Sequence, residues 1–209
     1  MGLLNGSASY CRFVTLGELP EEEMEQTWAD ALEANGFREI QPHSEEEVSA
    51  GWVRFEDAFE STWEPSELVG AGGVVVLRMR VDSLKIPAVT YKAHLIAAEK
   101  SRLKKLQRDK FTKSEKDQIK LEVKKDLRVR SLAKMQLIEA AWNISSGELR
   151  LFSTSKTVAA AFVELFEKTF GLSLRPVGAI TLLWLRGMSE EDLERLELID
   201  SERFHLESS

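Results

Sequence analysis

Residues 85–134 read KIPAVTYKAHLIAAEKSRLKKLQRDKFTKSEKDQIKLEVKKDLRVRSLAK, and this stretch decides the fold that we expect for the chain. The window from Arg78 to Lys134 contains 18 Lys and Arg against 7 Asp and Glu, a balance of 18 − 7 = +11. The remainder of the chain contains 28 − 18 = 10 basic and 35 − 7 = 28 acidic residues, a balance of −18. Charge segregated in this way favours a partner of opposite sign, and the expected partner of the basic part is a nucleic acid backbone.

The basic stretch predicts two helices. The first begins near Pro87, a residue suited to the first turn of a helix, and runs through KAHLIAAEKSRLKKLQRD. The second begins after Thr112, because Thr112 and Glu115 have the spacing of a capping box. The apolar face expected on the first helix consists of Val89, Ala93, Ile96, Leu103 and Leu106. The stripe expected on the second consists of Ile119, Val123 and Leu127.

Basic side chains occupy the other faces of these helices and one face of the strand expected at residues 73–82. Arg78 and Arg80 are two residues apart in that strand and therefore point to the same side. We expect them to extend the cationic surface from the helices onto the sheet. An alternative is that the lysines form only a solvated surface, paired with local carboxylates. The carboxylates are too few to neutralise them, which favours a nucleic-acid surface. The candidate DNA-binding residues are Arg78, Arg80, Arg102, Lys104, Lys105, Arg108, Lys113, Lys116, Lys120, Lys124, Arg128, Arg130 and Lys134.

Bulk composition narrows the class of protein. With 209 residues and 43% hydrophobic residues the chain is long enough for a real core, and no apolar run approaches the roughly 18 residues needed to span a bilayer. Cys11 is the only cysteine and the three histidines are scattered, so we expect no disulfide, no metal site and no cofactor. These features favour a cytoplasmic protein without a membrane segment.

The flanking sequences predict an α+β fold in which small mixed sheets flank the long basic helical arm. An N-terminal β-α-β unit is expected from a strand at 9–16, a helix from Pro20 and a short strand at 37–40. A C-terminal β-β-α-β unit is expected from strands at 136–143 and 148–153, a helix after Ser155 and a strand at 172–176. A strand at 179–185 and a short helix from Ser189 follow. The expected domains are residues 1–84, 85–134 and 135–209.

Four aromatic residues lie in the irregular segment at residues 41–73, which follows the N-terminal β-α-β unit. They are able to stack on bases, but no basic cluster lies beside them, so we expect them to pack in a small core instead. These residues are Trp52, Phe55, Phe59 and Trp63.

The order of these motifs resembles the recombination-associated RdgC family, whose members are often labelled exonucleases. The resemblance spans Tyr10 to Leu185 and has TKSEKDQIKLEV at its centre. The chain departs from the LPRAF pattern of the family at residues 127–132, where the proline and the aromatic residue are absent. The matching motifs are EEEMEQTWADAL, GWV, KIPAVTYKAHL, KKLQRDKFTKSEKDQIKLEVKKDLRVRSLAK and WNISSGELRLFSTSKTVAAAFVELFEKTFGLSLRPV.

The resemblance implies a cytoplasmic, nucleoid-associated DNA-binding protein of homologous recombination. It further implies a homodimer that binds duplex DNA without sequence preference and limits access of the RecA recombinase. Because family members are about a third longer at the C-terminal end, we expect a short member without the usual extension. The resemblance therefore does not imply that the dimer closes into a ring.

Two other functions are consistent with the sequence. Glu122-Val123-Lys124 matches half of a metal-dependent nuclease motif, in which a carboxylate holds Mg²⁺ and a lysine polarises the attacking water. That motif belongs on a strand, whereas these residues lie in a helical run, so we expect no catalysis. The remaining alternative is a dimeric protein-interaction module that binds no nucleic acid.

Overall fold

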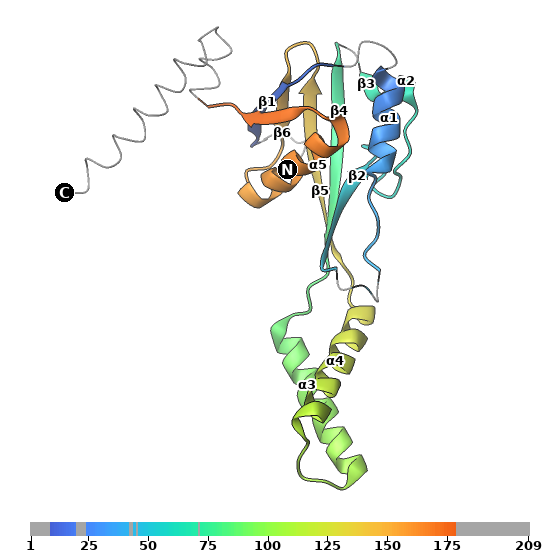
Figure 1. Cartoon of the computed structure of the whole chain (residues 1–209), viewed down its shortest axis with the longest axis vertical. Helices are drawn as coiled ribbons and strands as arrows, with labels where there is room; N and C mark the ends of the chain where they lie inside the picture. Colours follow the sequence, from blue (N-terminus) through green and yellow to red (C-terminus); the bar gives the residue numbers. More distant parts are fainter. Residues whose placement is uncertain (1–8, 20–23, 42–43, 45, 71, 179–209) are drawn as a thin grey trace, which may run out of the picture. The chain divides into compact units, whose positions relative to one another are not determined.

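The computed structural model describes residues 9–19, 24–41, 44, 46–70 and 72–178 (Figure 1). This part of the chain is a mixed α/β protein. Its elements are β1 (Cys11–Leu16), α1 (Met24–Ala34), β2 (Val48–Val53), α2 (Pro65–Leu68), β3 (Val69–Gly70), β4 (Val74–Ser83), α3 (Ala88–Leu106), α4 (Lys113–Arg130), β5 (Lys134–Asn143), β6 (Glu148–Leu151), α5 (Lys156–Phe170) and β7 (Ser173–Pro176). None of the described helices is long and apolar enough to cross a membrane.

The described strands form one sheet of seven strands. Its order is β2-β4-β5-β6-β1-β7, and β3 pairs with β4 beside this path. The pairs β1–β6, β1–β7, β3–β4 and β5–β6 are antiparallel. The expectation of separate small sheets is wrong, because β1, the first described strand, lies between β6 and β7 and so belongs to the same sheet as the strands late in the sequence.

The expected strand at 37–40 is not formed. Gly36 makes a single parallel bridge to Trp52, and the described residues between Gly36 and the start of β2 at Val48 form no strand. The ring of Phe37 packs against the guanidinium of Arg80 at 4.0 Å instead of facing a neighbouring strand. The expected strand at 179–185 and the helix from Ser189 lie outside the described residues.

Contacts within the described chain divide it into two compact units. The larger unit comprises the described residues up to Gly36, within Trp52–Met79 and from Ile138 onwards, and the smaller comprises the described residues of Phe37–Gly51 and Arg80–Leu137. We call them the sheet unit and the hairpin unit.

Aromatic side chains from four elements, α1, β2, β5 and α5, form the core of the sheet unit. The helix α5 begins at the cap Ser155, ends at Gly171 in the left-handed conformation and presents one aromatic face. Trp52 is fully buried and its Nε1 donates to Thr169 Oγ1 at 2.8 Å. Phe59 is 74% exposed, so the expectation that all four aromatics of its segment are core residues is wrong. The rings in mutual contact are Trp28, Trp52, Trp142, Phe162, Phe166 and Phe170.

The hairpin unit contains α3 and α4, which lie side by side and run in opposite directions (Figure 1). The capping box predicted at the start of α4 is present: Glu115 N–H donates to the Thr112 hydroxyl, and Thr112 N–H donates to the Glu115 carboxylate. The predicted stripe of α4 is also confirmed, since Ile119 and Leu127 are buried and Val123 is half-buried.

The apolar face predicted for α3 is wrong. Val89 is 83% exposed, and Ile96 and Leu106 are also exposed. A different side of α3 contacts α4: the Tyr91 hydroxyl donates to the Lys120 carbonyl, and Arg102 forms an ion pair with Glu122. Tyr91 and Arg102 are eleven residues apart, or about three helical turns, and therefore share a face. The side chain of Tyr91 and the aliphatic part of Arg102 thus contact α4, where we expected aliphatic residues.

Candidate nucleic-acid interface

The two compact units carry opposite net charge. The hairpin unit contains 18 Lys and Arg and 11 Asp and Glu, which gives 18 − 11 = +7. The rest of the chain contains 28 − 18 = 10 basic and 35 − 11 = 24 acidic residues, which gives −14. The charge segregation seen in the sequence therefore coincides with a structural division.

The turn between α3 and α4 brings two basic segments to one end of the hairpin. Gln107 adopts the left-handed conformation (φ 51°) and ends α3, and Thr112 starts α4 a few residues later. Consequently the last turns of α3 and the first turns of α4 lie at the same end (Figure 1). We call the exposed lysines of this end the tip cluster: Lys100, Lys104, Lys105, Lys110, Lys113 and Lys116.

The described part of the chain does not neutralise the tip cluster. None of its lysines forms an ion pair with any residue that the structure describes. The carboxylates nearby in sequence are Glu99, Asp109, Glu115 and Asp117. Glu115 is occupied by its capping hydrogen bonds with Thr112 and by an ion pair with Arg108 at 3.2 Å, and Asp117 pairs with Lys120. These hydrogen bonds, first of all the one from the Thr112 N–H, lower the pKa of Glu115. Lys104 and Lys105 are moreover stabilised by the helix dipole in the last turn of α3.

Most of the other candidate cations are engaged with carboxylates. Lys120 pairs with Asp117 at 2.9 Å, and this hydrogen bond raises the pKa of Lys120. Lys124 pairs with Glu47 at 3.6 Å, and Arg130 pairs with Asp126 at 2.9 Å. These exposed pairs are weak, so they reduce the local potential without fixing the side chains. Of the candidate DNA-binding residues on α4, only Lys113 and Lys116 are exposed and without an ion pair among the described residues.

The expected cationic surface on β4 is wrong. Arg80 is 5% exposed and forms a bidentate ion pair with Asp82, while its guanidinium packs on Phe37. Arg78 is half-buried, pairs with Glu139 at 2.6 Å and packs on the ring of Phe55 at 4.2 Å. Both arginines therefore support the fold, because a guanidinium held by a carboxylate and an aromatic face has no free side for a phosphate.

Arg128 also departs from the prediction. It is 8% exposed and donates a hydrogen bond from Nη2 to the backbone carbonyl of Glu46. Lys134, the last candidate, is exposed at the start of β5 and has no ion pair among the described residues.

Sequence reasoning missed two members of the tip cluster. Lys100 and Lys110 were absent from the candidates although they belong to the same basic run. Their closeness in sequence to the predicted capping box could have identified them. A helix that starts just after another ends implies a turn, and a turn brings the residues on both sides of it close together.

The residues of the nuclease-like tripeptide lie on α4, as the pattern predicted. Glu122 pairs with Arg102 of α3 at 2.9 Å, whereas Lys124 pairs with Glu47, so the two side chains have different partners. Among the residues that the structure describes, no three His, Cys, Asp or Glu side chains are grouped so that they could hold a metal ion.

No family model matches the chain, and no curated protein matches it. The resemblance to the RdgC family therefore rests on the motifs quoted above.

Proposed function

We propose that this protein binds DNA through the phosphate backbone, without sequence preference, and that the tip cluster is the main contact. One observation carries the proposal: six exposed lysines gather at the turn between α3 and α4 without a carboxylate partner in the described part of the chain. The cluster lies at a helix turn, where long flexible side chains can reach phosphates from both helices.

The physical basis is counterion release. Each lysine that contacts a phosphate displaces condensed cations, and log K falls against log salt with a slope of about −0.9 per contact on duplex DNA. If all six lysines make contact, the slope is about −5. Phosphate contacts position a protein on DNA but carry no sequence information, so the affinity is expected to be similar for unrelated sequences.

The resemblance to the RdgC family extends this proposal. It supports duplex DNA as the ligand, a homodimer as the binding species, a role in homologous recombination at the nucleoid, and antagonism of RecA. The acidic remainder of the chain disfavours a second DNA contact elsewhere, because like charges repel phosphate at distances up to about a Debye length.

Charge reversal at the tip cluster tests the proposal. In the double variant Lys104→Glu, Lys113→Glu the net charge falls by four, and the phosphate contacts proposed for both lysines are lost. The matched control is Lys156→Glu, Lys168→Glu, which changes the net charge by the same amount on α5, where both lysines are exposed. Binding of each variant to two unrelated duplexes is measured by fluorescence anisotropy over a salt series.

We expect the tip variant to weaken binding and to flatten the salt slope by about two contacts, whereas the control keeps the wild-type slope. Equal behaviour of the two variants would show that net charge, not the tip, governs binding. A wild-type affinity that does not change with salt would remove the DNA proposal and leave the protein-interaction alternative, which sizing of the protein with and without DNA then addresses.

A further inference from the structure

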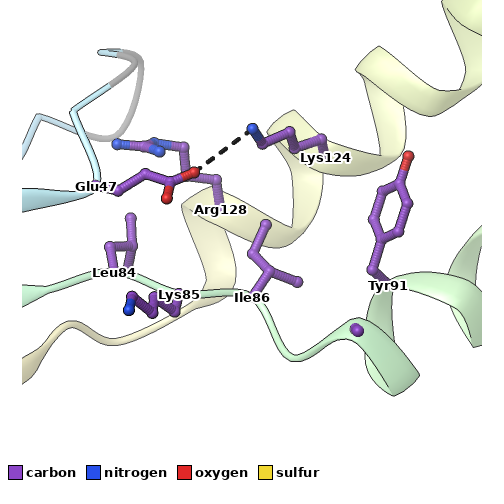
Figure 2. Close-up of a pocket in the computed structure, with 8 residues that line it drawn as sticks. Glu47, Leu84, Lys85, Ile86, Tyr91, Lys124 and Arg128 are labelled. Carbon is purple, nitrogen blue, oxygen red and sulfur yellow. Dashed lines mark ion pairs between the residues drawn. The ribbon is translucent and has the colours of Figure 1, made fainter. Parts of the chain in front are cut away.

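The hairpin unit contains an open pocket (Figure 2). It lies where α3 begins and α4 ends, the end of the hairpin opposite to the tip cluster (Figure 1). Its volume is about 520 Å³, within the range of small-molecule sites. The lining comes from the segment between β4 and α3, the start of α3, the last turns of α4 and the residue just before β2. The lining residues are Glu47, Leu84, Lys85, Ile86, Ala88, Tyr91, Lys124 and Arg128.

Three cations from two segments line this pocket. Lys85 follows β4 and forms no ion pair with the described residues, while Lys124 and Arg128 are one turn apart on α4. Glu47, the single carboxylate among the described lining residues, pairs with Lys124 at 3.6 Å (Figure 2). The described lining residues therefore carry a formal charge of 3 − 1 = +2, which favours an anionic ligand.

Arg128 supplies a second observation. Although it is buried, it forms no ion pair with a carboxylate among the described residues, and its Nε has no hydrogen-bond acceptor. Its one hydrogen bond within the described protein goes to the uncharged carbonyl of Glu46. A buried charge is costly unless an opposite charge accompanies it, so a bound anion would compensate the guanidinium through the field in the pocket.

The remaining wall is apolar. Leu84 is buried, Ile86 and Tyr91 are half-buried, and Figure 2 shows the ring of Tyr91 on the side of the pocket away from Glu47. The Tyr91 hydroxyl donates to the Lys120 carbonyl at 3.5 Å, which orients the ring. A flat, largely apolar group fits against these side chains while an attached oxyanion lies near the cations.

We propose that this pocket binds the terminal phosphate monoester of a nucleotide, with the nucleoside against Ile86 and Tyr91. Lys85 provides the exposed cation that contacts the phosphate. A monoester has more charge and more free oxygens than the diester within a strand, and it is therefore the phosphate form suited to several converging cations. The ligand is a free nucleoside monophosphate or the phosphorylated end of a DNA strand; the second source rests on the proposed DNA binding.

The test compares three DNA probes of equal length and sequence: a duplex with 5′-phosphates, the same duplex with 5′-hydroxyls, and a covalently closed circle. Binding of the free ligand is measured by calorimetry, which compares the affinity for deoxyadenosine monophosphate with that for deoxyadenosine. The variant is Lys85→Ala. The matched control is Lys92→Ala, an exposed lysine on α3 that does not line the pocket.

For the wild type we expect the phosphate on the strand end, on the free nucleoside, or on both to raise affinity by at least about tenfold, the effect of one charged hydrogen bond. Lys85→Ala is expected to remove this preference, and Lys92→Ala to retain it. A preference seen only with duplex ends identifies the strand as the source, and one seen with the monophosphate identifies the free ligand.

Equal affinity for phosphorylated and unphosphorylated probes of both kinds would overturn the inference, as would a preference that survives Lys85→Ala. The closed circle has no ends, so its salt-dependent binding reports backbone binding without any contribution from a strand end. Failure of the pocket is thereby distinguished from failure of the DNA proposal.

Discussion

Arg80 donates two hydrogen bonds to Asp82, from Nε to Oδ1 at 2.9 Å and from Nη2 to Oδ2 at 2.7 Å, and both side chains are buried. The two residues are two apart on β4 and so point to the same side of the strand. The other side of the guanidinium is covered by Phe37. An arginine that the sequence places on a cationic surface is thus part of the internal packing of the hairpin unit.

Replacement of Arg80 by alanine is expected to destabilise the protein by about 3–5 kcal/mol, because it leaves Asp82 buried without a counter-charge. Urea denaturation followed by fluorescence measures this loss. The variant Lys104→Ala serves as the comparison, since its side chain is exposed and its removal is expected to change stability by less than about 0.5 kcal/mol.

The same two variants separate structure from binding. Under conditions where both are folded, we expect Arg80→Ala to retain the wild-type salt slope for DNA and Lys104→Ala to lower it by about one contact. A reduced slope in the Arg80 variant would indicate that Arg80 contacts DNA.

The hydrogen bond between Trp52 and Thr169 supports the sheet unit. Thr169→Val keeps the shape of the side chain but leaves Trp52 Nε1 buried without an acceptor, at an expected cost of about 1–3 kcal/mol. Thr169→Ser retains the hydroxyl and is expected to lose less. The two unfolding midpoints, compared with wild type, check this order, and a valine variant at least as stable as the serine variant would contradict it.

The capping box of α4 makes part of its stability depend on pH. Because the pKa of Glu115 is lowered from 4.5 in the folded state, the carboxylate stabilises the fold at pH above 4.5, and the contribution is lost as the pH falls through the folded value. A carboxyl titration by NMR is expected to show Glu115 below 4.5. In Thr112→Ala, which removes the hydroxyl but keeps the backbone N–H, the pKa is expected to move only part of the way back.

Glu115→Gln provides the control for this pH effect. A glutamine oxygen still accepts from the Thr112 N–H, as in other capping boxes, but it has no carboxyl to titrate. Its stability is therefore expected to lack the Glu115 contribution to acid sensitivity. An unchanged acid profile would show that other carboxylates dominate.

The ion pair of Arg102 with Glu122 links α3 to α4 at 2.9 Å. Both side chains are partly exposed, so a double-mutant cycle with Arg102→Ala and Glu122→Ala is expected to give a coupling of about 0.2–1 kcal/mol. Measurement at low and high salt checks the electrostatic origin, since the coupling is expected to decrease in high salt. A coupling above about 3 kcal/mol would indicate that the pair has a larger role than an exposed ion pair.

Local patterns predicted much of the secondary structure. The helices α3, α4 and α5, the strand β4 and the hairpin of β5 and β6 arise near the residues expected for them, because periodicity, capping and turn signals act over a few positions. The capping box at Thr112 is the clearest case: its partners are three residues apart and need no tertiary contact.

The face that α3 presents to α4 was not predictable in the same way. Val89 and Ile96 make a regular apolar stripe, yet the partner helix packs against the side of Tyr91 and Arg102. A stripe on one helix indicates a preferred face, but the partner's own residues and the turn at Gln107 determine which face is covered.

The sequence by itself determined the excess of positive charge between Arg78 and Lys134 and the two helices that carry most of it, because composition and local periodicity are properties of neighbouring residues. Only the tertiary structure decided which cations are available. Arg80 and Arg128 are buried, whereas the lysines around the turn from α3 to α4 are exposed and collected at one end. The availability of a charge depends on whether a carboxylate, a carbonyl or an aromatic ring distant in sequence reaches it, and such contacts are made only when the chain folds.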